Sequence, residues 1–503
     1  MKRLIILLLL FVFLWGNNSA AYAVPTDFNG GVNNEFAYEE WVFVSGQAIK
    51  FVGSFTITEK ERNNQKTISY KFQLTPDDKS ISAKLDRNTT FSIDYSPRTD
   101  KGQTISHTKL DSYKETINID GVRYELDDYQ FNKSDAIDNQ PASDFSLGTF
   151  EGRKYYTINR NQGHLIVTVS GGEAGYDNFW GSTHTQIINY FYDSARTILA
   201  GGDNNETENA NWTGTVRVNV TDSVVKSLRY DDNTPVLSSF AGAHMRVTNQ
   251  ETSSILIYDM PRIDADGYPH PSRRDQYTVT LAKQMVPIID KLIIPKFRDL
   301  GGHWAEDHVN KLYSLDVFAE NSAFFVPDIP ITRLEFIRAV VKACDIRPSA
   351  PATRSRVSAR RAPPEVSPFN DFEAGNPDYV YVKSALEKGI ASGVSDSTFS
   401  PGSNLTRVQA VTILIRALGY DSVAPTPGYF TTFFDNDQIP GWGIDGVYMA
   451  QRIGLISGDF NNRFNPNQPM TKAEAAAMLV RFLEFLHIDL QKDYRENIVL
   501  FNT

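Results

Sequence analysis

Three short patterns place a basic side chain where a helix would begin. Each pattern starts with a threonine, continues with a cation, and ends with Glu or Gln three residues after the threonine. A threonine followed three residues later by Glu or Gln is typical of a capping box, in which the two side chains satisfy backbone N–H groups of the first helical turn. We therefore expect helix caps at Thr332 with Glu335, Thr406 with Gln409, and Thr471 with Glu474.

The cation in each pattern is unfavourable by itself, because the helix dipole disfavours positive charge on the first turn. The exception nevertheless occurs three times, at Arg333, Arg407 and Lys472. Backbone N–H groups at a helix start, combined with a basic side chain, suit a carboxylate ligand. We predict an anion-binding role for these cations; the simpler alternative is an exposed cation that extends into water.

An aspartate precedes the three threonines by 33, 35 and 36 residues, within a Phe-x-Asp sequence. Asp299, Asp371 and Asp435 are each followed by a predicted short helix, a turn, and an aromatic residue close to a proline. This periodicity predicts a repeated helical architecture. The simplest role for each aspartate is to cap the helix that follows it.

These features divide the chain after residue 290 into three predicted repeats and a linker. The repeats are expected at residues 297–344, 369–420 and 433–486. Residues 345–368 are rich in Arg, Pro and Ser, which is typical of an exposed linker. Contact of this linker with an anionic wall polymer is the alternative.

Residues 24–290 contain short segments rich in β-branched and aromatic residues, separated by Asn, Asp and Gly clusters. They predict an all-β region of one or two sandwiches, with a possible break near residues 136–152. We find no complete catalytic signature and assign no catalytic residue. His164 and His184 are interpreted as framework residues. The acidic stretches 203–209 and 264–267 could offer oxygen ligands to calcium, but neither completes an EF-hand, so acidic turns are preferred and no cofactor or metal is predicted.

Composition restricts the partners. The 503-residue chain has a net charge of −10, which argues against a nucleic-acid partner. The one cysteine, Cys344, excludes an internal disulfide and a cysteine-based zinc site. Residues 1–23 combine two basic residues, an apolar run and Ala21-Tyr22-Ala23, which predicts a secretory signal peptide. No later apolar run is long enough to span a bilayer, so we expect a secreted protein that either diffuses away or is held non-covalently at a surface.

The repeats resemble the S-layer homology (SLH) family. The resemblance is clearest in the second copy, where Lys388-Gly389-Ile390-Ala391-Ser392-Gly393 is followed by Phe399-Ser400-Pro401. It implies an all-α unit of three repeats in a pseudo-threefold arrangement, with grooves that bind secondary cell-wall polysaccharide carrying ketal-linked pyruvate. The polysaccharide-binding residues that it implies are Asp371, Gly389, Gly393, Arg407, Asp435, Gly454, Gly458 and Lys472, with weaker contributions from Asp299, Trp304, Arg333 and Trp442.

The first copy departs from this pattern, because Asp316-Val317-Phe318-Ala319-Glu320 replaces the glycine-containing loop. We expect these acids to weaken any groove that depends on this loop, and we assign Arg333 a smaller role for that reason. Trp304 and Trp442 are expected to pack in the core or groove wall, with sugar stacking as the alternative.

Three functions fit the predicted anchor. The first is a structural cell-surface protein of the S-layer type, which self-assembles or contacts other envelope proteins through residues 24–290. The second is a wall-anchored polysaccharide-active enzyme. The third is a glycan-binding adhesin with an exposed aromatic platform, to which Trp180 or Trp212 could contribute.

Overall fold

The computed structural model describes residues 28–62, 64–98, 100–199, 207–231, 243–264, 267–295, 297–318, 322–346, 365–425 and 430–489. The predicted signal peptide lies outside these residues. So do most of the predicted linker and parts of both acidic stretches considered for calcium.

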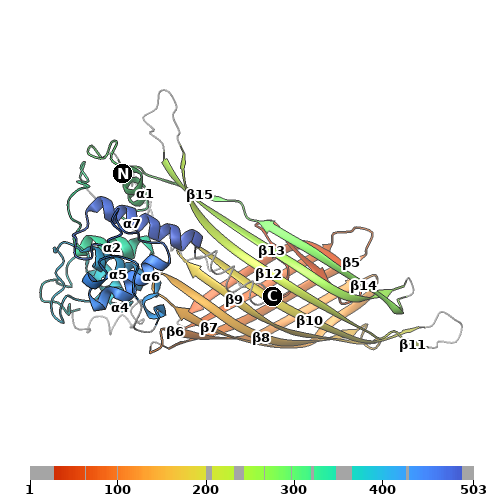
Figure 1. The fold of residues 1–503 in the computed structure, drawn as a ribbon. Helices are drawn as coiled ribbons and strands as arrows, with labels where there is room; N and C mark the ends of the chain where they lie inside the picture. The colour runs from red at the N-terminus through yellow and green to blue at the C-terminus, as the bar shows by residue number, and fades with distance from the viewer. Residues whose placement is uncertain are drawn as a thin grey trace, which may run out of the picture.

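Residues 32–292 form one antiparallel sheet in which almost every strand pairs with the next along the chain (Figure 1). Two short strands depart from this order, since β11 pairs only with β10 and β15 pairs with β13. The strands are β1 Val32–Asn33, β2 Tyr38–Val42, β3 Ile49–Arg62, β4 Gln65–Pro76, β5 Ala83–Arg98, β6 Gln103–Ile119, β7 Val122–Asn139, β8 Ser143–Ile158, β9 Gly163–Asn178, β10 Gly181–Leu199, β11 Thr207–Asn209, β12 Trp212–Asp231, β13 Ala243–Ile263, β14 Pro269–Gln284 and β15 Ile288–Leu292.

Our prediction of short-stranded sandwiches is therefore wrong. β13 alone is 21 residues long, and the suggested break at 136–152 falls within the paired strands β7 and β8. Gly148 and Gly152, which fall within that suggested break, lie inside β8, and Gly171 lies inside β9. A Cβ at Gly171 would overlap the carbonyl oxygen of Ile187 and the ring of Phe150, so this glycine permits close packing within the sheet.

The curved sheet encloses its own core. Side chains alternate along the strands, as in β4, where Ile68, Tyr70, Phe72 and Leu74 are buried while the residues between them are more exposed. This two-residue period directs one face of the sheet inward. The interior is rich in aromatic rings. Because the curved sheet packs against its own inner face, it does not need the second sheet of a sandwich.

The N-terminal segment, residues 28–31, lies within this interior. The ring of Phe28 packs 4.7 Å from that of Phe131 and 5.3 Å from that of Phe150. Its carbonyl oxygen accepts a hydrogen bond of 2.6 Å from the Tyr190 hydroxyl on β10, and that of Gly30 accepts one of 2.8 Å from Ser254 on β13. The segment therefore connects the first part of the sheet to its last long strands, and β1 lies beside β13 and β14.

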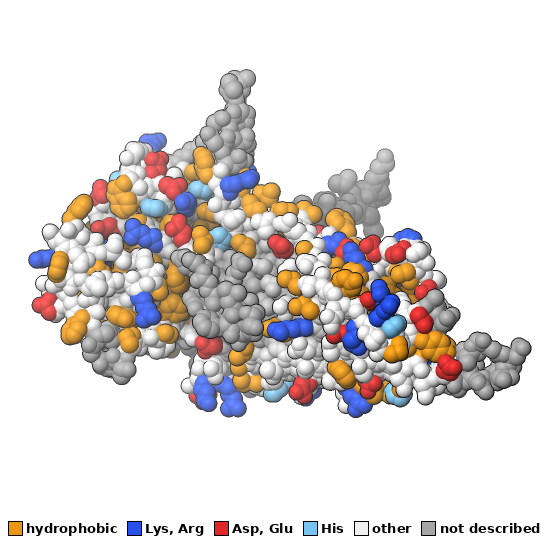
Figure 2. All heavy atoms as spheres, turned by 45° about the vertical axis from the view of Figure 1, so that its right-hand side comes forward, with side chains coloured by type: hydrophobic (Ala, Val, Ile, Leu, Met, Phe, Trp, Pro, Cys, Tyr) orange, Lys and Arg blue, Asp and Glu red, His pale blue; other side chains and the backbone are white. Residues whose placement is uncertain are grey.

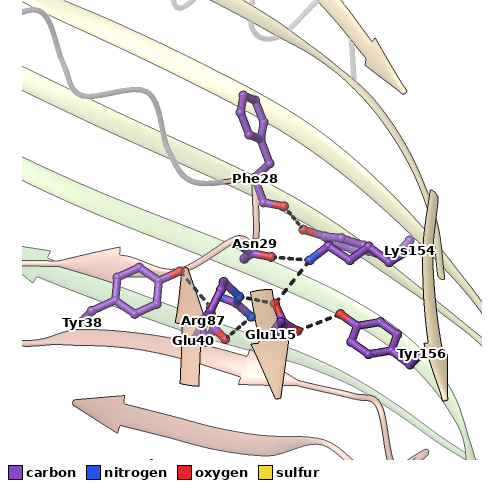
Figure 3. Close-up of polar contacts among 9 residues, drawn as sticks. Phe28, Asn29, Tyr38, Glu40, Arg87, Glu115, Lys154 and Tyr156 are labelled. Carbon is purple, nitrogen blue, oxygen red and sulfur yellow. Dashed lines mark hydrogen bonds and ion pairs between the residues drawn. The ribbon is translucent and has the colours of Figure 1, made fainter. Parts of the chain in front are cut away.

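A buried charge network joins strands across this interior (Figure 3). Arg87 on β5 donates two hydrogen bonds to the carboxylate of Glu40 on β2, at 2.8 and 2.9 Å, and a third to Glu115 on β6. Glu115 also accepts a hydrogen bond of 2.7 Å from the Tyr156 hydroxyl on β8. Burial alone would raise the pKa of Glu115, but Arg87, Lys154 and Tyr156 lower it to about 2.

The C-terminal part contains, among its described residues, six α-helices of 9 to 13 residues. They are α1 Glu306–Ser314, α2 Arg333–Ala343, α4 Tyr379–Glu387, α5 Arg407–Leu418, α6 Ile444–Arg452 and α7 Lys472–Glu484. The prediction of an all-α unit is wrong. Three 3₁₀ turns, extended loops and isolated β-bridges lie between the helices, because the loops form inter-repeat backbone hydrogen bonds.

The helices gather at one end of the sheet, where two strand connections contact them (Figure 1). The Ala142 N–H donates to the Ala417 carbonyl oxygen at 2.9 Å, and the Asn178 amide donates to that of Leu486 at 3.2 Å. Trp180 is buried in the hydrophobic cluster that contains the helices. Trp212 is buried inside the sheet. Neither can contribute to the exposed aromatic platform that we considered.

The surface seen in Figure 2 carries both signs of charge, with basic, acidic and apolar side chains interspersed. Among the described residues, no helix is both long enough and apolar enough to cross a membrane.

We predict that Arg87→Met destabilises the protein by about 3–5 kcal/mol at pH 7, because it removes the cation that the buried carboxylates of Glu40 and Glu115 share. The deficit should shrink as the pH falls from 7 to 4, since protonation then neutralises these carboxyls. In the unsubstituted protein, by contrast, lowering the pH reduces the free energy of unfolding, because the pKa of Glu115 is lower in the folded than in the unfolded state. Its stabilising contribution is complete above about 4.5 and is lost as the pH falls toward 2.

Denaturant unfolding at both pH values tests this prediction. Arg123→Met is the matched control, because Arg123 forms an exposed ion pair with Glu125 at 3.0 Å. Loss of such a pair should cost less than about 1 kcal/mol. Equal losses in the two variants would contradict a structural role for the buried network.

Candidate functional site

The helices α2, α5 and α7 begin directly after the three threonines. Thr332, Thr406 and Thr471 have extended backbones at the N-cap positions. The N–H groups of Thr332 and Thr471 donate to Glu335 and Glu474 at 2.9 Å, and that of Thr406 donates to Gln409 at 3.1 Å. These reciprocal contacts fix the first turn of each helix.

Backbone hydrogen bonds join the three repeats in a closed ring. The Ile331 N–H donates to the Met470 carbonyl oxygen, that of Met470 to Leu405, and that of Leu405 to Ile331, at 2.9, 2.9 and 3.0 Å. Each repeat therefore donates to one neighbour and accepts from the other. The ring brings the starts of α2, α5 and α7 together around one axis.

The same neighbours occupy the first N–H groups of each helix. Arg333 donates its backbone N–H to the Ser403 carbonyl oxygen, Arg407 to that of Gln468, and Lys472 to that of Ile329. The next N–H of each helix donates to a proline carbonyl of the adjacent repeat. We had expected these backbone groups to assist carboxylate binding. Since they already have partners, an anion here must rely on the cationic side chains.

Each cation reaches across the boundary to the next repeat. The guanidinium of Arg333 lies 5.3 Å from the ring centroid of Phe399 in the second repeat and donates to the Ser392 carbonyl oxygen. Arg407 repeats this geometry against the third repeat, at 5.3 Å from Phe464 and with a 3.2 Å bond to Ser457. None of the three cations simply extends into water, because Arg333 and Lys472 are buried and Arg407 is partly buried.

Lys472 differs from the two arginines in its electrostatic partner. Its ammonium lies 5.6 Å from the Phe325 ring of the first repeat and forms an ion pair with Glu335 at 3.2 Å. By contrast, the Nε atoms of Arg333 and Arg407 are buried and have no hydrogen-bond partner among the described residues. Two of the three boundaries thus retain an unused charged donor.

The three aspartates hold turns rather than helix starts. Asp371 accepts hydrogen bonds from the N–H groups of Phe399 and Ser400 at 2.8 and 2.7 Å. Asp299 and Asp435 do the same at the equivalent turns, and the second residue of each turn has a positive φ angle. The bonds from Phe399 and Ser400 lower the pKa of Asp371. We had placed these residues at helix starts, but α1, α4 and α6 begin several residues later.

The loop glycines support the turns that face the arginines. Gly389 and Gly454 adopt φ angles of 69° and 75°, in the left-handed region that glycine enters without steric cost. A Cβ at Gly393 would overlap the Ser395 carbonyl oxygen, and one at Gly458 would lie 2.8 Å from the Asn462 side chain. Gly393 and Gly458 therefore permit the loops to pack closely, and Gly389 and Gly454 permit the change of direction after α4 and α6.

Asp316 occupies the corresponding backbone position in the first repeat, with a φ angle of 59°. Its carboxylate pairs with Lys342 at 3.1 Å and is largely exposed. Glu320, the other acid in this loop, lies outside the described residues. Trp304 and Trp442 are more than half exposed, so neither packs in the core, and a place in a groove wall or a sugar-stacking role stays a prediction.

We predict that Asp316→Gly stabilises the protein by about 0.5–1 kcal/mol, because glycine removes the strain of a positive φ angle. Asp316→Asn is the control, since it removes the ion pair with Lys342 but leaves a residue that still tolerates this conformation. Thermal unfolding should rank the glycine variant above the asparagine variant. The reverse order would contradict backbone strain at this position, and a loss of stability in both variants relative to the unsubstituted protein would show that the ion pair outweighs the strain.

Comparison with known proteins agrees with the repeat structure. The S-layer homology domain model matches residues 296–337, 368–411 and 435–476. An endoglucanase of Bacillus sp. (strain KSM-635) is 31% identical over 26% of this chain and 14% of its own length. A cell surface protein of Thermoanaerobacter kivui is 29% identical over 25% of this chain and 17% of its own length.

A third relative, the surface-layer 125 kDa protein of Lysinibacillus sphaericus, is 24% identical over 41% of this chain and 16% of its own length. This chain therefore spans less than a fifth of the length of each of these relatives. The three segments that the family model matches coincide with the three repeats that form the ring of backbone hydrogen bonds. The C-terminal part of this protein consists of three tandem S-layer homology domains.

Proposed function

We propose that this protein is a structural cell-surface protein, anchored to the bacterial cell wall by its three SLH domains, with the sheet as its outward-facing part. Proteins with hydrolase names and proteins with surface-layer names both match limited portions of this chain. A shared anchor joined to different outward-facing regions produces such a distribution. Wall attachment is accordingly assigned to residues 296–476.

The ligand of the anchor is an anionic wall polysaccharide, and a pyruvyl ketal supplies the carboxylate. The observation that carries this proposal is that the guanidinium groups of Arg333 and Arg407 each donate one hydrogen bond among the described residues, to a carbonyl oxygen, which leaves further N–H groups for a ligand. A guanidinium donates charge-assisted hydrogen bonds to a carboxylate in a fixed geometry. The adjoining aromatic rings, Phe399 and Phe464, hold each guanidinium in place at the repeat boundary.

The contacts across the boundaries change the expected ranking of the cations. We had linked Arg333 to the loop of its own repeat, which contains Asp316. The structure places Arg333 against the glycine-containing loop of the second repeat instead, while Lys472 faces the first repeat. Arg333 and Arg407 are therefore assigned the principal contacts, and Lys472 a smaller one because Glu335 already neutralises it.

We predict that Arg333→Met and Arg407→Met each weaken wall binding about tenfold or more. Loss of a charge-assisted hydrogen bond costs roughly 1.5–3 kcal/mol, and each 1.4 kcal/mol is a factor of ten in affinity. Lys472→Met should have a smaller effect. Methionine retains apolar contact with the aromatic ring, so folding should survive. The measurement is co-sedimentation of residues 24–503 with purified wall sacculi, with a thermal melt for each variant.

Arg452→Met, on the exposed surface of α6, is the matched control for loss of one positive charge. It should leave wall binding unchanged. If Lys472→Met proves the most damaging of the four while its melting curve is unchanged, the assignment of the arginine boundaries as the principal sites is wrong.

The identity of the polymer needs a separate test. Sacculi that retain their polysaccharide should bind the protein, whereas sacculi stripped of it by acid should not. Enzymatic or chemical removal of the pyruvyl ketal alone should reduce binding as strongly as the arginine substitutions do. Undiminished binding to stripped peptidoglycan would rule out the polysaccharide as the ligand.

A further inference from the structure

A cavity of about 390 Å³ lies inside the sheet, near the strand connections at its helical end. Inward-facing side chains of β4 to β10 line it. One wall contains the rings of Phe28, Tyr70 and Phe91, and another carries the hydroxyl groups of Ser106 and Thr108. The cavity is separate from the repeat boundaries described above, and the wall-binding proposal does not use it.

Three polar atoms on the lining side chains have no hydrogen-bond partner among the described residues. They are Ser146 Oγ on β8, Asp177 Oδ2 on β9 and His184 Nε2 on β10, and each is shielded from solvent. Ser182, which pairs with Asp177 across the strands, is 2% exposed and its hydroxyl also lacks a partner. A buried polar group left unpaired is destabilising, because it has lost its hydrogen bonds to water. Such a cluster is expected where a ligand supplies the missing partners.

The sheet makes room for this cluster at Gly175. A Cβ at this position would overlap the Nδ1 atom of His184 and approach Ser146 Oγ to 2.9 Å. The backbone of β9 thus allows the imidazole and the hydroxyl to lie next to each other. His184 Nδ1 is 3.5 Å from Glu173, which orients the imidazole and leaves Nε2 without a hydrogen-bond partner among the described residues.

Two carboxyl groups at this end of the cavity lie on neighbouring strands, and neither forms an ion pair within 4 Å among the described residues. Asp144 on β8 and Asp177 on β9 are directly paired in register, an arrangement in which like charges destabilise a sheet. Burial, together with the neighbouring carboxylate of Asp144, raises the pKa of Asp177 to about 6, despite an opposing effect of His184. Burial also raises the pKa of Asp144, although the hydrogen bond of 3.0 Å that it accepts from Asn139, and to a smaller extent Lys388 of the second repeat, act in the other direction.

The other buried acids of the cavity are compensated. Lys133 contacts Asp135 at 3.0 Å and Glu173 at 2.8 Å, and Ser106 donates a hydrogen bond to Asp135. The surplus of acceptor groups is therefore concentrated at Asp144 and Asp177. A cationic donor would balance both carboxylates, while aromatic and hydroxyl-bearing walls suit a sugar ring with its own hydroxyl groups.

We propose that this cavity binds an amine-bearing saccharide, a hexosamine unit whose ammonium group contacts Asp144 and Asp177 and whose hydroxyl groups meet Ser146 and His184. The cavity volume is of the size of small-ligand sites, for which about 300–1,000 Å³ is usual. Such a site would give the outward-facing sheet a glycan specificity opposite in charge to that of the anchor.

The test is calorimetric titration of residues 24–503 at pH 7 with four ligands. They are the β-1,4-linked glucosamine disaccharide, its N-acetylated form, cellobiose, and the diamine putrescine. The glucosamine disaccharide should bind at least tenfold more tightly than the other three. Equal binding of the acetylated sugar or of cellobiose would overturn the role of the amine, and equal binding of putrescine would overturn the role of the sugar.

Asp177→Asn should reduce binding of the glucosamine disaccharide at least tenfold. It should not lower the melting temperature, because it removes a carboxyl group that lacks a hydrogen-bond donor. Asp193→Asn, on the exposed face of β10, is the control and should leave binding unchanged. Retained binding by a folded Asp177→Asn variant would overturn the proposal.

The Arg333→Met/Arg407→Met double variant separates this inference from wall attachment. It should lose wall binding and keep full affinity for the glucosamine disaccharide. Parallel loss of both activities in a variant with an unchanged melting curve would show that the saccharide binds at the repeat boundaries, and would overturn the cavity assignment.

Discussion

The sheet depends on one buried guanidinium. Arg87 contacts Glu40 and Glu115, which lie on different strands, and all three side chains are almost inaccessible to solvent. Burying these charges is costly, so the cluster is tolerated only while every member keeps its partners. This requirement specifies how β2 lies relative to the neighbouring strands β5 and β6, on which Arg87 and Glu115 are directly paired. Lys154, which contacts Glu115 at 3.9 Å and Asn29 at 2.9 Å, extends the same requirement to β8 and the N-terminal segment.

In the SLH domains, too, the structure depends on contacts between distant parts of the chain, because each repeat forms backbone hydrogen bonds with its neighbours. A helix start from one repeat meets a turn from its neighbour, and the ring of backbone hydrogen bonds leaves the first N–H groups of the helices occupied. Ligand recognition therefore falls to side chains at the boundaries. The two boundaries with arginine retain a charged donor, whereas Glu335 satisfies the lysine at the third. The binding surface is a property of the assembled ring and belongs to no single repeat.

Local signals in the sequence were informative where a few neighbouring residues decide the conformation. The helices α2, α5 and α7 begin immediately after Thr332, Thr406 and Thr471, because a capping box involves residues only three positions apart. The strands were harder to predict. Gly171 and Gly175 resemble turn signals in the sequence, yet they lie within β9 because side chains and carbonyl groups of β8 and β10 approach their backbones. Nothing local to these glycines distinguishes the two roles.

The sequence by itself determined the three repeats, the start of the second helix in each, and the predominance of strands in the N-terminal part, since these follow from composition and short spacings. The tertiary structure decided that one sheet closes on its own core and that each cation faces the neighbouring repeat. The reason is the separation of the partners along the chain. Arg87 lies 47 residues from Glu40, and Arg333 lies 59 residues from Ser392. Contacts of this range depend on how the whole chain folds, which no periodicity or capping motif records.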